Sequence, residues 1–297
     1  MLPHLRVLRP HQNIYSFYDG RITGYRFATD KNWIDDGALA LGIASYAIVD
    51  GDEALIYDTH VSIEHATQIR SLLSESGIKH FTVILSHWHL DHIAGTSVFA
   101  DCTIISTQRT AEHLINNRYM IEAGSLHGPP ALNPLVMPTQ TFTGQRTLRI
   151  GSLVLELIET HIHTDDATVV WLGSQSVLLA GDTMEDTITY VCEPECFDTH
   201  LNELDRLWIL NPAHILPNHG NPDIISSGGY KKTLIRATQQ YIRMLKRCAI
   251  EPELRTKPLR ELIKGPLDIG WVSYFDAYEA VHRKNIERSC NTLKSDA

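Results

Sequence analysis

Hydrophobic positions along the chain form two successive β-rich halves, each followed by helical patterns. Short runs rich in β-branched and aromatic residues predict strands in the first half at residues 14–17, 45–49, 54–57, 81–85 and 103–106. Helical spacing of apolar residues predicts helices there over 63–73 and 109–117. The second half repeats this order, with predicted strands at residues 147–150, 153–158, 168–172, 177–180 and 215–217. This order favours an α/β protein built as an αββα four-layer sandwich, with two sheets face to face and helices outside.

The last third of the chain is predicted to be helical. Asp198 opens a helix whose leucines recur at helical spacing, and further helices are expected over 230–248 and 273–290. We therefore divide the chain into a core over residues 1–228 and a helical extension over 229–297 that packs on the core, together forming one structural domain. The extension is interpreted as a helical cap or dimer surface. The alternative is a wall of the substrate pocket made by Trp271, Tyr274 and Phe275.

Composition narrows the class of protein. With 297 residues and 43% hydrophobic residues, the chain can bury a sizeable core. The net charge of −9 disfavours a nucleic-acid partner, although it does not exclude a local basic patch. We expect no membrane association and a cytoplasmic location, since residues 1–10 lack the apolar segment of a signal peptide. The five cysteines have no framework spacing and are expected to be reduced, with a metal or redox pair at Cys192 and Cys196 as the alternative.

The densest cluster of possible metal-binding side chains lies directly after the predicted strand 81–85. Residues 87–92 read His-Trp-His-Leu-Asp-His. His87 and His89 alternate by two, so on an extended strand end they would point to the same side. Asp91 and His92 would then fall where the chain turns and face a second centre. Imidazole and carboxylate ligands of this kind suit a divalent ion, with zinc as the first expectation and manganese or iron as alternatives.

Four ligands cannot hold two metal ions, so other strand ends should supply more. Three candidates follow predicted strands: His161 or His163, which share one strand face, then Asp182, and then His219. Each follows an apolar run, as Asp91 and His92 do. Ligands at the carboxyl ends of buried strands are typical of open α/β sheets.

These motifs, in this order, resemble the dinuclear hydrolase branch of the metallo-β-lactamase superfamily. The resemblance implies one metal held by His87, His89 and His163 and a second held by Asp91, His92 and His219, with Asp182 bridging both. His163 is chosen over His161 because His163-Thr164 matches the family pattern, which leaves His161 as a wall or supporting residue. Asp58 resembles a family aspartate that braces the metal loop. The family's early loop, here residues 32–41, often overhangs the metals, so Trp33 and Ile34 are candidates for an apolar pocket.

The expected function is metal-dependent hydrolysis of a small molecule. Two divalent ions would activate a bridging hydroxide to attack an ester-type carbonyl of a lactone, ester or thioester in a neutral or moderately apolar substrate. Asp91, Asp182 and Tyr190 are the candidate catalytic residues, with the Tyr190 hydroxyl near the carbonyl or leaving group. The alternative is a phosphodiesterase or nuclease of the same superfamily. The net negative charge of the chain and the lack of a run of basic residues near the motifs weigh against a phosphodiesterase or nuclease. A homo-oligomer is compatible with the sequence.

Overall fold

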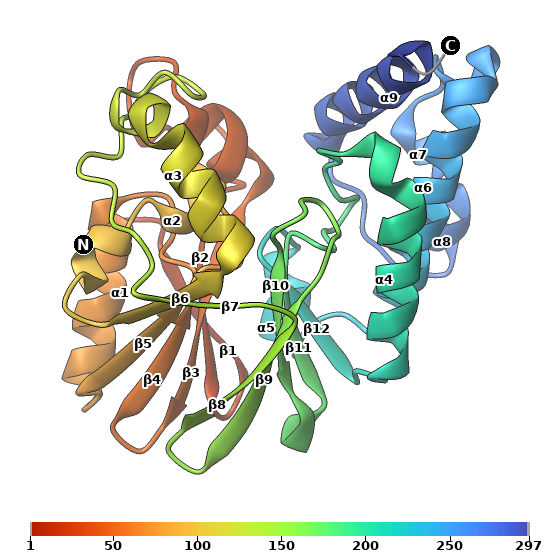
Figure 1. The fold of residues 1–297 in the computed structure, drawn as a ribbon. Coiled ribbons are helices and arrows are strands. Elements are labelled where there is room, and N and C mark those ends of the chain that lie inside the picture. The colour runs from red at the N-terminus through yellow and green to blue at the C-terminus, as the bar shows by residue number, and fades with distance from the viewer. Residues whose placement is uncertain (1, 296–297) are drawn as a thin grey trace.

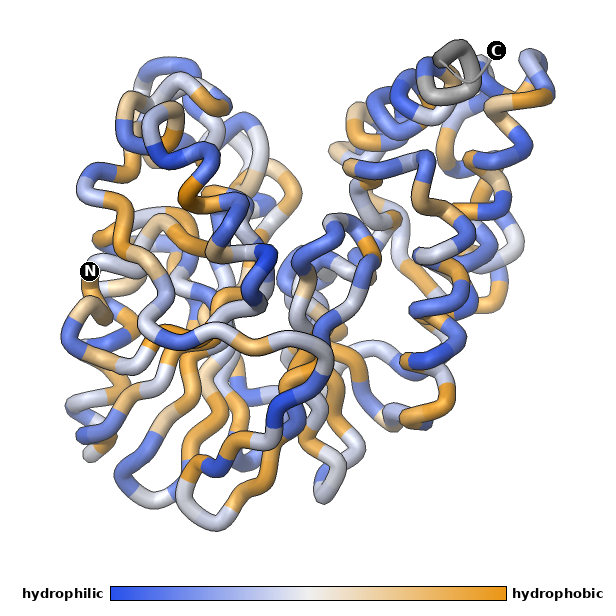
Figure 2. The backbone as a smooth tube through the Cα atoms, in the orientation of Figure 1, coloured by the Kyte–Doolittle hydropathy of each residue, from blue (hydrophilic) through white to orange (hydrophobic). Residues whose placement is uncertain are grey.

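Two sheets pack face to face between two layers of helices in the computed structural model, which describes residues 2–295 (Figure 1). This arrangement confirms the predicted αββα sandwich. Hydrophobic residues gather along the strands, whereas the helices alternate between hydrophobic and hydrophilic positions (Figure 2). Within the described chain, no helix combines the length and apolar character that a membrane span requires.

The first sheet contains seven strands in sequential order. They are β1 (Arg6–His11), β2 (Ile14–Asp19), β3 (Ile43–Asp50), β4 (Glu53–Tyr57), β5 (His80–Ile84), β6 (Thr103–Thr107) and β7 (Gln140–Phe142). Strands β1 to β4 pair antiparallel, and β4 to β7 pair parallel. Most of β3 is buried, since the second sheet covers one face of this sheet and helices cover the other. The parallel strands all direct their carboxyl ends to one edge of the sandwich.

Three helices belong to this half: α1 (Ile63–Glu75), α2 (Leu90–Ile93) and α3 (Gln108–Glu122). The Ser62 side chain caps α1 by accepting a hydrogen bond from the His65 amide. Ala66, Ile69 and Leu73 of α1 share a buried cluster with residues of β4 and β5, which joins the helix to the outer face of the sheet. A short π-helical segment, Ile34–Leu39, lies in the loop between β2 and β3.

The second sheet contains five strands in the order β12-β11-β10-β9-β8. They are β8 (Gln145–Ile150), β9 (Leu153–Glu159), β10 (Thr168–Leu172), β11 (Val177–Gly181) and β12 (His214–Pro217). Strand β10 is antiparallel to both β9 and β11, and β12 is parallel to β11. The strands β9, β11 and β12 therefore run in the same direction and end at the same edge.

The outer layer of this sheet comes from the end of the chain. Its helices are α4 (Phe197–Ile209), α5 (Pro222–Ser226), α6 (Thr233–Ile250), α7 (Leu259–Leu262), α8 (Lys264–Asp268) and α9 (Tyr278–Ser295). One buried cluster joins strand residues such as Leu179 to Leu245 of α6 and Ile286 of α9. The helical extension thus shares its core with the sheet, while the boundary after residue 228 stays a prediction.

Several elements differ from the sequence-based expectation. Strand β1 was not predicted, because its sequence Arg-Val-Leu-Arg-Pro-His lacks the regular alternation of a half-buried strand and contains Pro10, which an edge strand tolerates. Helix α6 begins at Thr233 rather than at Tyr230, because Tyr230 pairs with Ile215 of β12 through two backbone hydrogen bonds of 2.8 Å. The last helix begins at Tyr278 rather than at Ser273.

The segment before α9 is bound to the loop after β11. The Ser273 amide donates to the Asp186 carboxylate at 2.7 Å, and the Ser273 hydroxyl donates to the same group. The Phe275 amide donates to the Thr187 hydroxyl at 2.9 Å. These bonds tie residues 273–275 to the loop after β11.

Candidate metal centre

All seven candidate ligands lie in segments that follow the carboxyl ends of strands, and two of them, Asp91 and His92, belong to the short helix α2. The segment after β5, which includes α2, carries four of them and the loops after β9, β11 and β12 carry one each: His87, His89, Asp91, His92, His163, Asp182 and His219. Because these strands end at the same edge of the sandwich, the structure brings all seven side chains together. Sequence reasoning placed His87 and His89 on a strand end, but β5 ends at Ile84 and His89 is the first residue before α2.

The first ligand set consists of His87, His89 and His163. Their nitrogens converge, with His89 Nδ1 lying 2.9 Å from His87 Nε2 and 3.1 Å from His163 Nε2. Nitrogens that bind zinc at 2.0–2.1 Å with tetrahedral angles lie about 3.3 Å apart, so this spacing fits a shared ion. His89 directs Nδ1 to the point where His87 and His163 direct Nε2. The nearer ring nitrogen thus lets His89, at the start of α2, share this point with the two loop histidines.

The second ligand set consists of Asp91, His92 and His219, and Asp182 lies between the two sets. His219 Nε2 is 3.3 Å from Asp91 Oδ2, and His92 Nε2 is 3.1 Å from Asp182 Oδ2. The same Asp182 oxygen lies 3.8 Å from His87 Nε2 and 3.9 Å from His163 Nε2. Asp182 therefore occupies the position that a bridging carboxylate would need.

The hydrogen bonds of the ligands test whether a metal fits here. The second ring nitrogen of each of three histidines donates to an oxygen that cannot donate back: His92 Nδ1 to Asp58 at 2.8 Å, His163 Nδ1 to the Tyr190 carbonyl at 2.8 Å, and His219 Nδ1 to the Gly42 carbonyl at 2.7 Å. When these rings bind a metal as neutral imidazoles, the proton stays on Nδ1 and the Nε2 lone pair is available for ligation. Among the described residues, the buried Asp182 Oδ1 has no hydrogen-bond partner. A cation would satisfy that oxygen, so the residues fit divalent metal ions.

Asp58 braces both the motif loop and a ligand. Its carboxylate accepts hydrogen bonds from the Ser86 amide and hydroxyl at 2.6 Å each, from His92 at 2.8 Å and from the Asn218 amide at 2.5 Å. Asp58 is fully buried and has a left-handed backbone with φ of 65°. That conformation is unfavourable for a residue with a Cβ, so its contacts must hold it in place.

The charges of the centre divide along the two ligand sets. Burial lowers the pKa of His87, His89 and His163, so these rings stay neutral and can bind metal at neutral pH. Burial also opposes charge on His92, but Asp182, Asp91 and Asp58 together raise the pKa of His92 well above its usual value. Such a concentration of carboxylates around an imidazole favours a positive charge, which a metal ion would supply instead.

Five of the seven candidate ligands line a cavity of about 490 Å³: His89, Asp91, His163, Asp182 and His219. Apolar and aromatic side chains provide other parts of its wall, including Trp33, Ala38, Leu41 and Trp88. The volume lies within the range of sites that bind small molecules.

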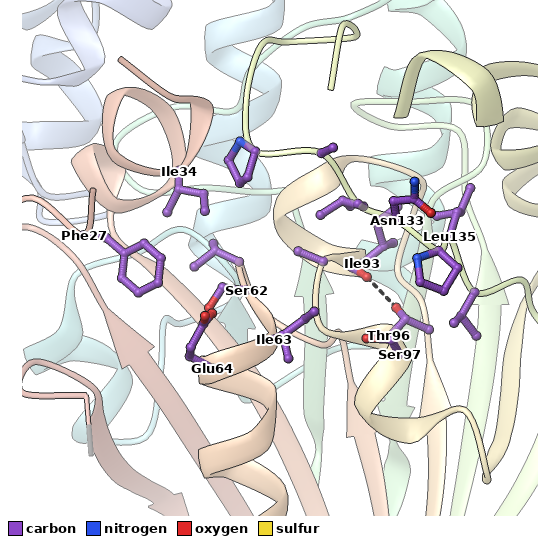
Figure 3. Close-up of a pocket in the computed structure, with 17 residues that line it drawn as sticks. Phe27, Ile34, Ser62, Ile63, Glu64, Ile93, Thr96, Ser97, Asn133 and Leu135 are labelled. Carbon is purple, nitrogen blue, oxygen red and sulfur yellow. Dashed lines mark hydrogen bonds between the residues drawn. The ribbon is translucent and has the colours of Figure 1, made fainter. Parts of the chain in front are cut away.

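The structure places the residues of the early loop at two different sites. Trp33 lines the cavity at the ligands, and its indole N–H donates to the Pro130 carbonyl at 3.0 Å. Ile34, which was expected beside Trp33, instead lines a second cavity of about 220 Å³ with Phe27 and Ile93 (Figure 3). The π-helical turn at these positions separates the two side chains, since neighbouring helical residues face different directions.

Two other predicted residues differ in how they relate to the ligands. His161 lies outside the two ligand sets, and its Nε2 is 2.6 Å from a Glu193 carboxylate oxygen. Tyr190 lines the cavity, and its carbonyl anchors His163. Burial raises the pKa of the Tyr190 hydroxyl, which therefore keeps its proton at neutral pH.

Helix α9 contributes cavity residues that sequence reasoning missed. Lys284 and Arg288 line the cavity, whereas Trp271, Tyr274 and Phe275 are absent from its described lining. Glu185 also lines it, and burial together with the Asp182 charge raises the pKa of the Glu185 carboxyl to about 7. The helical pattern of the tail carried the signal for α9, but nothing in the pattern showed which face would meet the cavity.

Comparison with known proteins agrees with this geometry. A model of the metallo-beta-lactamase superfamily matches residues 39–219, which include every candidate ligand. The beta-lactamase-like protein 2 homolog of Caenorhabditis elegans is 21% identical over 188 residues, covering 60% of this chain and 56% of that protein. Its Drosophila melanogaster counterpart is 22% identical over 189 residues, covering 61% of this chain and 59% of that protein. The chain thus spans a little over half the length of the curated relatives that it matches.

Solved structures of similar shape support the fold. The metallo-beta-lactamase of Pontibacter korlensis has a TM-score of 0.56 and 16% identity, covering 78% of this chain and 99% of that one. VMB-1 has a TM-score of 0.59 and 15% identity, covering 82% of this chain and 98% of that one. DIM-1 metallo-beta-lactamase has a TM-score of 0.55 and 20% identity, covering 80% of this chain and 98% of that one. At these identities the likeness shows the shared architecture.

Proposed function

The chain belongs to the metallo-beta-lactamase superfamily of metal-dependent hydrolases, and from this premise we propose that it uses two divalent ions to hydrolyse an ester-type carbonyl compound. The proposed substrates are lactones, esters or thioesters of small molecules, and zinc is the proposed metal. The observation that carries the proposal is the meeting of two complete ligand sets at Asp182, at the wall of a cavity of small-molecule size.

Divalent ions held by these ligands would supply an activated water at neutral pH and a Lewis acid for the substrate's carbonyl oxygen. The chain itself positions the substrate and handles protons. Asp182 is almost completely buried, whereas the Asp91 side chain is 21% exposed. We therefore assign Asp91 the role of accepting the proton of the attacking water, because substrate and solvent reach its carboxylate.

The wall of the cavity would bind the acyl chain or ring of the proposed substrate. Trp33 and Trp88 present aromatic surface, and the hydrogen bond of Trp33 to Pro130 holds its ring in place. The protonated Tyr190 hydroxyl is assigned to the carbonyl or leaving-group oxygen of the substrate, to which it can donate.

Phosphodiester hydrolysis is the second candidate, and one observation favours it. Lys284 and Arg288 bring positive charge to the cavity, although the sequence showed no basic run near the motifs. Cations at such a site would stabilise a phosphoryl group. The ester proposal ranks first because the remaining wall is largely apolar and the net charge of the chain is −9.

A substrate panel on metal-loaded protein tests the ranking. Lactones, aryl esters, thioesters and bis-4-nitrophenyl phosphate are assayed side by side, before and after chelation. We expect turnover of at least one carbonyl class, its loss on chelation, and its return on addition of zinc. Phosphodiester turnover far above that of every ester would reverse the assignment.

A further inference from the structure

Two cations of helix α9 line the cavity that contains the candidate ligands. Lys284 and Arg288 are four residues apart, so they share one face of the helix. Both side chains are exposed to solvent. Like charges at this spacing weaken a helix, so helix stability alone does not account for the pair.

The carboxylates that line the same cavity are engaged elsewhere. Asp91 and Asp182 belong to the ligand sets, and Glu193 lies 2.6 Å from His161. Glu185 accepts hydrogen bonds from the Tyr278 hydroxyl at 2.9 Å and the Tyr190 amide at 2.8 Å. Among the residues that the structure describes, none of these carboxylates forms an ion pair with Lys284.

Arg288 is held in a defined position at the cavity wall. Its guanidinium donates to the Cys192 carbonyl at 3.2 Å and lies 4.9 Å from the centre of the Tyr190 ring. His127, on the loop after α3, lines the same cavity. Burial lowers the pKa of His127 although the Asp91 charge opposes this shift, so the ring is neutral at neutral pH and the positive charge of this wall comes from Lys284 and Arg288. One region of the cavity is therefore basic in a chain of net charge −9.

We infer that the face of α9 formed by Lys284 and Arg288 is an anion subsite, which binds a carboxylate or phosphate on a substrate whose ester-type carbonyl lies at the metal ligands. This inference rests on the proposed function and specifies its substrate as an anionic ester. The apolar wall around Trp33 and Trp88 would receive the chain that joins the two groups. The inference replaces the neutral substrate expected from the sequence, which could not show that α9 reaches the site.

A matched pair of esters tests the anion subsite. Mono-4-nitrophenyl adipate and 4-nitrophenyl hexanoate share the leaving group and chain length, but only the adipate ester carries a carboxylate. Metal-loaded wild type should have a kcat/KM at least about tenfold higher for the adipate ester, and salt should reduce that preference. Lys284→Gln should lose about tenfold more activity on the adipate ester than on the hexanoate ester. Arg283→Gln, an exposed neighbour outside the cavity lining, removes the same charge from the same helix and should keep the preference.

Isothermal titration of the same proteins with adipate gives a readout that is independent of turnover. Lys284→Gln should bind adipate about tenfold more weakly than Arg283→Gln. An equal ester preference in wild type and Lys284→Gln, or equal adipate binding by the two variants, would overturn the anion subsite while leaving ester hydrolysis intact. Absence of ester turnover would contradict the proposed function, and the titration would still decide the subsite. A 4-nitrophenyl ester of 6-phosphooxyhexanoate distinguishes the two anions, since a higher kcat/KM for it than for the adipate ester would assign the subsite to phosphate.

Discussion

Asp182 is the residue at which the two ligand sets meet. Its Oδ2 lies between 3.1 and 3.9 Å from one ring nitrogen of each of four histidines. Burial opposes charge on this carboxyl, but His92 and His219 hold its pKa well below the usual range. The group is therefore anionic at neutral pH and available to two cations at once.

The candidate ligands could be located in the sequence because each lies shortly after an apolar run, and strand ends gather at one edge of a sheet. The choice of His163 and the division into two sets rested on the family resemblance. The partners of the ligands were less accessible to prediction. The Gly42 and Tyr190 carbonyls orient His219 and His163, and a backbone acceptor leaves no residue-type signal in the sequence. Glu185 was missed because its raised pKa results from burial and from Asp182, both of which depend on the fold.

Substitution of the two neighbouring histidines should separate their roles. His163→Ala removes a nitrogen from the first ligand set and should release metal and abolish activity. His161→Ala should retain metal, because His161 pairs with Glu193 instead. Elemental analysis of both variants checks this expectation, and the reverse pattern would show that the ligand has been misassigned by two residues.

Asp166 should make stability depend on pH. Burial raises the pKa of its carboxyl from 3.8 to about 6. The folded state therefore binds the proton more tightly than the unfolded state. The protonated carboxyl's contribution to the free energy of unfolding is fully present below about pH 4 and is lost as pH rises through about 6. Relative to wild type, Asp166→Asn should gain about 1 kcal/mol of unfolding free energy between pH 5 and pH 8. Urea denaturation with excess chelator measures the difference, and a difference that does not change with pH would contradict the assignment.

At the scale of elements, α9 is a helix that the sequence predicted without predicting its place at the cavity. The pattern of the tail predicted a helix over 273–290. The helix begins only at Tyr278, and Ser273 is bonded to Asp186, which lies 87 residues earlier in the chain. The pattern could not show that Lys284 and Arg288 would line the cavity, since periodicity identifies a face of a helix but not its partner.

Helix α9 also supports the first ligand set through Asn285. The Asn285 side chain accepts from the Val191 amide at 2.9 Å and donates to the Thr189 carbonyl at 3.0 Å. These residues flank Tyr190, whose carbonyl holds His163. Asn285→Leu should cost about 1–3 kcal/mol for each buried group left unpaired, and should weaken metal binding about tenfold or more.

Thermal melting and chelator competition measure the two effects of Asn285→Leu. Glu287→Gln is the matched control, because Glu287 is an exposed residue of the same helix. Unchanged metal affinity in a destabilised Asn285→Leu protein would show that α9 supports only the fold.

The loop that carries Trp33 should contribute binding rather than chemistry. Trp33→Ala removes a large apolar surface from the cavity, so KM should rise about tenfold or more with kcat nearly intact. Trp33→Phe retains an aromatic ring and should show a smaller rise. Steady-state kinetics on the best ester substrate check both variants, and an unchanged KM for Trp33→Ala would place the substrate elsewhere in the cavity.

At the scale of the whole molecule, the fold concentrates the site at one edge of two facing sheets. The order of strands and helices was sufficient to predict the sandwich, because two β-rich halves each require a covering layer of helices. How the two β-rich halves pack against each other came from the family resemblance and the structure. Local sequence patterns do not show which strand ends face each other. The combined edge holds ligands from β5, β9, β11 and β12, so neither sheet alone forms the centre.

Metal stoichiometry tests the central claim most directly. Wild-type protein is dialysed to saturation with zinc, freed of unbound metal and analysed for zinc per chain, in parallel with Asp182→Ala. The two ligand sets predict about two zinc ions per wild-type chain. They also predict fewer ions in Asp182→Ala, with an activity loss of at least about 100-fold. One zinc ion per wild-type chain at saturation, with full activity, would contradict the dinuclear centre.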